Sequence, residues 1–101
     1  MITGFPSPAQ GYECASLDLN RELIKHPVST VVMTVSGSRY TNMSIYNGDL
    51  LVIDRAKKVL PNSLVVYESG GQFVLGRAFN IKEESIITGV ITYVIHKVKE
   101  V

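Results

Sequence analysis

Residues 86–98 read IITGVITYVIHKV and decide the fold class. Ile, Val and Thr branch at Cβ, and such side chains fit the pleated surface of a sheet better than the crowded surface of a helix. We therefore expect one long strand from Ile86 to Val98, bent at Gly89 because glycine weakens strand packing. Thirteen Val, nine Ile and six Thr among 101 residues extend this pattern to the whole chain. The sequence predicts a mainly β fold.

Four shorter apolar runs predict further strands. Two turn signals, Asn47-Gly48-Asp49 and Ser69-Gly70-Gly71, separate some of them, and the second is typical of a hairpin. The first run reads as a largely buried strand. The expected strands comprise Thr30–Ser36, Leu50–Ile53, Ser63–Tyr67 and Gln72–Leu75.

One short helix is expected ahead of the strands. Leu19 and Leu23 recur with helical spacing, and Asp18 or Asn20 can cap the helix at its N-terminus. Pro27 disfavours helical backbone at the residue before it and ends the helix. His26 then lies at the helix C-terminus, where a cation is favoured by the helix dipole.

Length and charge indicate a single domain without a strong electrostatic field. A chain of 101 residues forms one modest core. A net charge of +1 gives no basis for direct nucleic-acid binding. No apolar run approaches the ~18 residues of a membrane span, and no signal peptide is visible. The lone Cys14 forms no internal disulfide, which fits a reducing compartment. We expect a soluble cytoplasmic protein with an extended arm over residues 1–16 and one domain over 17–101.

Chemistry-bearing motifs are sparse. His26 and His96 lie far apart and Cys14 has no second thiol nearby, so we expect no metal site, and no cofactor motif occurs. His96 alternates with apolar neighbours and is expected on a strand, facing solvent or a partner. The segment from Ser36 to Arg39 resembles a site, because a serine in a glycine-containing turn can act as a nucleophile beside a base. The alternative is an ordinary turn held by serine side chains.

Seven segments, in order and spacing, resemble the UmuD branch of the LexA/UmuD family of self-cleaving serine peptidases. They are residues 4–9 (GFPSPA), 17–20 (LDLN), 26–27 (HP), 36–37 (SG), 47–54 (NGDLLVID), 71–73 (GQF) and 89–96 (GVITYVIH). The resemblance implies the compact, signal-peptidase-like β fold of the LexA/UmuD C-terminal domain. It also implies a Ser–Lys dyad that cuts the protein's own chain on the RecA filament, with the lysine kept neutral by burial so that it can act as a base.

The resemblance fails at both positions of that dyad. With Asp49 as the anchor, the position of the nucleophilic serine is Arg39 and that of the lysine is Gly76. Ser38 is one residue early, and in extended backbone a shift of one residue points a side chain to the opposite face. Arg77 is a poor base because a guanidinium group stays protonated. We expect no peptidase activity.

The start of the sequence fits the same interpretation. Self-cleavage in the family removes an N-terminal arm just before the segment that begins here at Gly4, and this sequence starts at Met1. We expect a protein encoded in the processed form. The alternative is a sequence trimmed to that boundary, which would not explain Arg39 and Gly76.

The resemblance implies an accessory subunit of an error-prone polymerase. Processed UmuD forms a homodimer that binds the UmuC polymerase, a Y-family enzyme, to form polymerase V, with RecA as a cofactor of that assembly. We expect the same of this bacterial, plasmid-borne or phage-borne protein. The alternative is an inactive decoy that pairs with intact UmuD or LexA proteins, with Arg39 excluding or docking a peptide in the old cleft.

Two surfaces are candidates for these partners. The last strand could pair with a second copy if it is an uncovered edge, and an interior position is the alternative. The candidate dimer residues are Gly89, Val90, Ile91, Tyr93, Ile95 and His96. The candidate partner-binding arm contains Phe5, Pro6 and Pro8.

Overall fold

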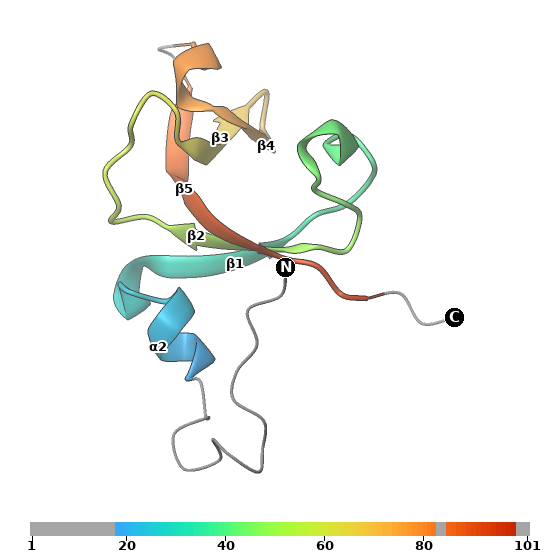
Figure 1. The fold of residues 1–101 in the computed structure, drawn as a ribbon. Helices are drawn as coiled ribbons and strands as arrows, with labels where there is room; N and C mark the ends of the chain where they lie inside the picture. Colours follow the sequence, from blue (N-terminus) through green and yellow to red (C-terminus); the bar gives the residue numbers. More distant parts are fainter. Residues whose placement is uncertain (1–17, 83–84, 99–101) are drawn as a thin grey trace.

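The computed structural model describes residues 18–82 and 85–98 and contains a single antiparallel sheet of five strands (Figure 1). This confirms the mainly β prediction. The elements are α2 (Leu19–Leu23), the 3-10 turn η1 (Pro27–Ser29), β1 (Thr30–Thr34), η2 (Thr41–Met43), β2 (Leu50–Asp54), β3 (Leu64–Ser69), β4 (Gln72–Arg77), η3 (Ala78–Asn80) and β5 (Ile86–Ile95). None of the helices in this described part has the length and apolarity needed to cross a membrane.

Strand β5 lies in the middle of the sheet, whose order is β1-β2-β5-β3-β4. Of the two alternatives left open for this strand, an uncovered edge and an interior position, the interior position is therefore correct. Its first half, Ile86–Val90, pairs with β3, and Val90–Ile95 pairs with β2. An apolar run with so many β-branched residues is typical of an interior strand as well as of an exposed edge, so composition could not distinguish them.

The two halves of β5 have different neighbours, so each half keeps one side open. Among the described residues, the ladder pairs of Ile91–Ile95 are all with β2, and those of Ile86–Gly89 are all with β3. The register shifts between Val52 and Ile53 and again between Val66 and Tyr67. Figure 1 shows β5 curving as it passes from one half of the sheet to the other.

Gly89 sits where this curved strand crosses β2. A Cβ atom at Gly89 would lie 2.7 Å from Cγ2 of Ile53 and 3.0 Å from the backbone oxygen of Asp54. No larger residue fits there without moving the backbone. The bend expected near Gly89 is therefore a close crossing of two strands.

The main core cluster is formed by β2, β3, β5 and the turn after β1. It contains the buried side chains of Val35, Ile45, Leu51, Ile53, Val66 and Ile91. Strand β1 is less buried than predicted, with Val32 54% exposed, because β1 is an edge of the sheet.

Helix α2 begins as predicted but ends early. The Asp18 side chain accepts a hydrogen bond from the backbone N–H of Arg21, at 3.2 Å, which confirms Asp18 as the N-cap. The helix ends at Leu23, and Ile24 is already extended. The prediction that His26 caps this helix is wrong, because His26 lies beyond it and precedes η1.

Candidate functional site

The turn after β1 lies against β4, so the structure brings together the two segments that carry the expected dyad positions. The hydroxyl of Tyr40 accepts a hydrogen bond from the backbone N–H of Leu75, at 3.1 Å. Tyr40 follows Arg39, and Leu75 precedes Gly76. Two segments about 35 positions apart in the chain are therefore in direct contact at this site.

Arg39 projects from the exposed turn. Its guanidinium carbon lies 5.8 Å from the centroid of the Tyr40 ring, which is within the range of a cation–π contact. Gly37 has a φ of +92°, and its N–H donates to the Asn47 side chain at 2.7 Å. The turn is thus held by a left-handed glycine and an asparagine.

Gly76 is half-buried on β4, beside the ring of Tyr67. A Cβ atom at Gly76 would lie 3.3 Å from Cε1 of Tyr67 and 3.6 Å from its hydroxyl oxygen. Tyr67 pairs across the ladder with Val74, so its ring extends along the sheet towards Gly76. A longer side chain at Gly76 would have to displace this ring.

The neighbouring residues offer no hydrogen-bonded nucleophile and base. Within residues 18–82 and 85–98, neither Ser36 nor Ser38 has a side-chain hydrogen bond to a titratable group, and the Ser38 carbonyl accepts from the Thr41 hydroxyl at 3.2 Å. Arg77 donates through Nη1 to the backbone carbonyl of Asn62, at 2.9 Å. The guanidinium group of Arg77 is therefore bound to the β2–β3 loop.

A small cavity of about 190 Å³ lies beside the turn. Its walls come from β1, the turn, β2, β3 and β4, and they are mostly apolar, with the side chains of Ser36 and Tyr40 among them. Phe73, 57% exposed, forms part of the rim. The cavity can hold an apolar side chain of an extended peptide.

Two aspartates at the ends of β2 each bind a histidine, a feature that the sequence analysis missed. Oδ1 of Asp49 lies 2.6 Å from Nδ1 of His96, and Oδ2 of Asp54 lies 2.5 Å from Nδ1 of His26. Both carboxylates are buried, with Asp49 1% and Asp54 5% exposed. One signal in the sequence could have revealed these pairs, because an aspartate lies at each end of the apolar run of β2. A carboxylate that is buried with such a strand needs a hydrogen-bonding partner.

His96 is exposed as expected, with its side chain 56% accessible, but it lies just beyond the strand. It follows the last residue of β5, and its ring makes an edge-on contact with Tyr46, with ring centroids 5.6 Å apart. His26 likewise binds Asp54 instead of capping α2.

Hydrogen bonding sets the charge state of both aspartates. The hydrogen bond from the Tyr46 backbone N–H is the main cause that lowers the pKa of Asp49 from its usual value, and the hydrogen bond with His96 is the second. Burial of the carboxylate acts in the opposite direction but is outweighed. The His26 hydrogen bond, with further backbone N–H donors, lowers the pKa of Asp54. Both groups are anions at neutral pH.

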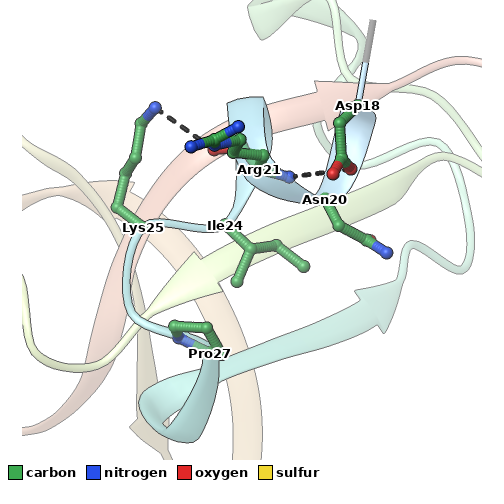
Figure 2. Close-up of a pocket in the computed structure, with 6 residues that line it drawn as sticks. All are labelled: Asp18, Asn20, Arg21, Ile24, Lys25 and Pro27. Carbon is green, nitrogen blue, oxygen red and sulfur yellow. Dashed lines mark hydrogen bonds between the residues drawn. The ribbon is translucent and has the colours of Figure 1, made fainter. Parts of the chain in front are cut away.

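An open groove lies between α2 and Pro27 (Figure 2). Figure 2 shows Asp18 bonded to the Arg21 backbone and Lys25 reaching back to the same turn. The Lys25 ammonium donates to the Arg21 carbonyl at 3.3 Å. These hydrogen bonds complete the helix ends, and we assign the groove no separate chemistry.

The expected dimer residues divide into two groups. Gly89, Val90 and Ile91 are buried in the sheet and form no exposed side-chain surface, a correction that follows from the interior position of β5. Tyr93 and Ile95 are about 40% exposed, and the His96 side chain is 56% exposed. The expected arm residues Phe5, Pro6 and Pro8 lie outside the described residues, as does Cys14.

Comparison with known proteins identifies the family. Residues 2–87 match the model of the peptidase S24-like family. The chain is 36% identical to protein ImpA of Salmonella typhimurium over 115 aligned positions, which cover 96% of this chain and 79% of ImpA. It is 34% identical to protein SamA of the same species, over 95% of this chain and 80% of SamA.

A third relative matches over a shorter span. The chain is 42% identical to protein MucA of Escherichia coli over 74 positions, which cover 73% of this chain and 51% of MucA. The chain therefore belongs to the peptidase S24-like family, the family of LexA and of the UmuD-type SOS mutagenesis proteins, and it is a UmuD-like member.

Proposed function

We propose that this protein is a non-catalytic accessory subunit of an error-prone polymerase in SOS mutagenesis. It would act in the bacterial cytoplasm as a homodimer bound to a UmuC-like Y-family DNA polymerase, with the RecA filament as a further partner. The observation that carries the proposal is an intact family fold whose two expected dyad positions hold Arg39 and Gly76.

The surroundings of these two positions support the loss of catalysis. A peptidase dyad needs a serine hydroxyl and a neutral amine within hydrogen-bonding distance. Arg39 lies over the Tyr40 ring instead, and the Tyr67 ring lies against Gly76. A UmuD-like protein without a peptidase site can still supply the binding surfaces of an accessory subunit.

The second half of β5 supports dimerisation. The side of Ile91–Ile95 that faces away from β2 has no ladder partner among the described residues, so its backbone groups are available to another strand. The exposed side chains of Tyr93, Val94 and Ile95 surround this open side. Pairing of two copies here would satisfy the backbone groups and bury apolar surface.

The test is light scattering after size exclusion, on the protein alone and mixed with a UmuC-like polymerase from the same host. We expect a stable dimer that moves completely into a complex of two copies with one polymerase. A protein that stays separate from the polymerase would contradict the accessory role.

A decoy function is the second candidate, and the cavity beside the turn after β1 favours it. About 190 Å³ of mostly apolar space remains next to the turn, although the dyad positions have changed. Such a cavity could hold the cleavage segment of an intact relative. Subunit exchange measured with labelled LexA or UmuD distinguishes the two functions, because a decoy should form mixed dimers in preference to its own dimer.

A further inference from the structure

A second pocket, of about 310 Å³, lies where the segment after α2 meets the end of β2 and the second half of β5. Its lining residues are Leu23, Lys25, His26, Asp54, Lys57, Thr92 and Tyr93. None of these residues belongs to the expected dyad, and the volume is at the lower end of that of small-molecule sites. The pocket is therefore separate from the expected peptidase site.

The single carboxylate in the lining is already hydrogen-bonded. Oδ2 of Asp54 lies 2.5 Å from Nδ1 of His26, and Oδ1 accepts the backbone N–H of Ala56 at 2.9 Å. Both oxygens of this buried group are engaged, so Asp54 orients the His26 ring and does not hold a cation in the pocket. His26 keeps its second ring nitrogen, Nε2, available, since its side chain is 51% exposed.

Two lysine ammonium groups line the pocket with this one carboxylate. Lys25 and Lys57 are exposed, and within residues 18–82 and 85–98 the ion pairs are those of the two aspartates with histidines. Lys25 uses one of its three N–H donors on the Arg21 carbonyl, at 3.3 Å, which leaves two. The pocket carries an uncompensated positive charge next to an oriented imidazole.

The segments that line the pocket carry more basic than acidic residues. The segments that meet here, joined by the His26–Asp54 bond, also carry exposed Arg21, Arg55 and Lys58, against the exposed carboxylates of Asp18 and Glu22. A net charge of +1 for the whole chain conceals this local concentration. A positive surface of this kind attracts anions through its summed field.

We propose that this pocket binds a phosphate group. Lysines bind phosphate as point charges, and two of them line this pocket. Both lysines line the same pocket, and a phosphate monoester carries nearly two negative charges at pH 7. The phosphate could belong to a small molecule or to a nucleic-acid strand, whose base could stack on the Tyr93 ring, 39% exposed. The inference does not depend on the polymerase partnership.

The experiment titrates the full chain with inorganic phosphate and follows its backbone amides by NMR. We expect saturable shifts at Lys57, Thr92 and Tyr93. The variant K25A/K57A should bind phosphate at least roughly tenfold more weakly, because two charges of the same site are lost. The matched control K82A/K97A removes the same charge elsewhere on the chain and should bind within about twofold of the parent.

Two further probes distinguish the sources of the phosphate, and either outcome supports phosphate binding in this pocket. Tighter binding of a 5′-phosphorylated single-stranded oligonucleotide than of its unphosphorylated form indicates a strand end. An oligonucleotide that binds no tighter than inorganic phosphate or dAMP indicates a small ligand. The proposal is overturned by the absence of saturable shifts, or by an equal loss of binding in both double variants while thermal melting shows that they are folded.

Discussion

Nδ1 of His96 lies 2.6 Å from Oδ1 of Asp49, so the segment that leaves β5 is bound to the turn that leads into β2. Oδ2 of the same carboxylate accepts the backbone N–H of Tyr46, at 2.9 Å. A carboxylate only 1% exposed is thus fully hydrogen-bonded on both oxygens. His26 and Asp54 repeat the arrangement at the other end of β2, so β2 is bound both to the segment before β1 and to the segment after β5.

Substitution of His96 should destabilise the protein. In H96A the buried Asp49 keeps its bond to Tyr46 but loses its histidine, and a buried polar group without its partner is costly. We expect a melting temperature lower by several degrees. The neighbouring variant K97A should melt like the parent, and equal melting of H96A and K97A would contradict the structural role of this pair.

Acid should destabilise the protein through Asp49 and Asp54. Hydrogen bonds to Tyr46 and His96, and to His26, lower the folded-state pKa of these groups below the ordinary 3.8. A group whose pKa is lowered on folding adds stability above its unfolded pKa and loses it as pH falls through the folded pKa. Urea unfolding at a series of pH values should show full stability at neutrality and a steep loss below about pH 4.

The double variant D49N/D54N provides the control for this acid sensitivity. Asparagine keeps the shape and one oxygen acceptor but cannot titrate. We expect lower stability at neutral pH and a flatter acid limb. An acid limb as steep as that of the parent would mean that other carboxylates cause the loss.

Gly89 and Gly76 should differ sharply in their tolerance of alanine. A Cβ atom at Gly89 would lie 2.7 Å from Ile53 and 3.0 Å from the Asp54 backbone, so G89A should cost roughly 1–3 kcal/mol in the free energy of unfolding. At Gly76 the contact is 3.3 Å and is made by the Tyr67 side chain, which can move. G76A should change the free energy of unfolding by less than about 1 kcal/mol. Alanine reduces the conformational entropy of the unfolded chain, and this gain offsets the close contact with the Tyr67 ring. Equal effects in urea unfolding would refute the close crossing of β5 and β2.

A charge at Ile95 should weaken the proposed dimer. Ile95 is 40% exposed at the open side of β5, and I95E would bury a carboxylate wherever two such strands meet. Light scattering should show a dissociation constant raised by at least roughly tenfold. The variant V28E places the same charge on a fully exposed residue of η1 and should leave the dimer intact. A dimer that tolerates I95E would locate the interface elsewhere.

Restoration of the dyad should require more than two substitutions. R39S/G76K supplies the missing groups, but the lysine would meet the Tyr67 ring, so we expect cleavage only after a further change such as Y67A. The assay is cleavage in trans of a UmuD-type protein whose own dyad has been inactivated. Cleavage by the unaltered protein would contradict the proposed loss of activity.

Local patterns predicted the elements well but not their neighbours. The five strands fall at the expected apolar runs, and Asp18 caps α2 as expected, because period and capping are local properties. The position of β5 depends on which strands it contacts, and its own sequence carries no such information. Gly89, Val90 and Ile91 were expected at a surface for that reason and are buried.

The candidate site was only partly predictable. The register from Asp49 led to Arg39 and Gly76, and the structure places their segments in contact through Tyr40 and Leu75. The two Asp–His pairs join residues 28 and 47 positions apart, and pairing over such distances leaves no periodic signal in the sequence. The pocket proposed for phosphate depends on one of these pairs and was therefore not visible.

The central position of β5 has a consequence for the order of folding. Strands β2 and β3 are adjacent in the sequence but are joined in the sheet only through β5, which follows both of them. A growing chain can form the β1–β2 pair and the β3–β4 hairpin early, yet each half leaves an apolar edge open until residues 86–95 insert between them. We expect the rate-limiting step to be this late insertion, and folding to be slow for a chain of this length because its decisive contacts are distant in sequence.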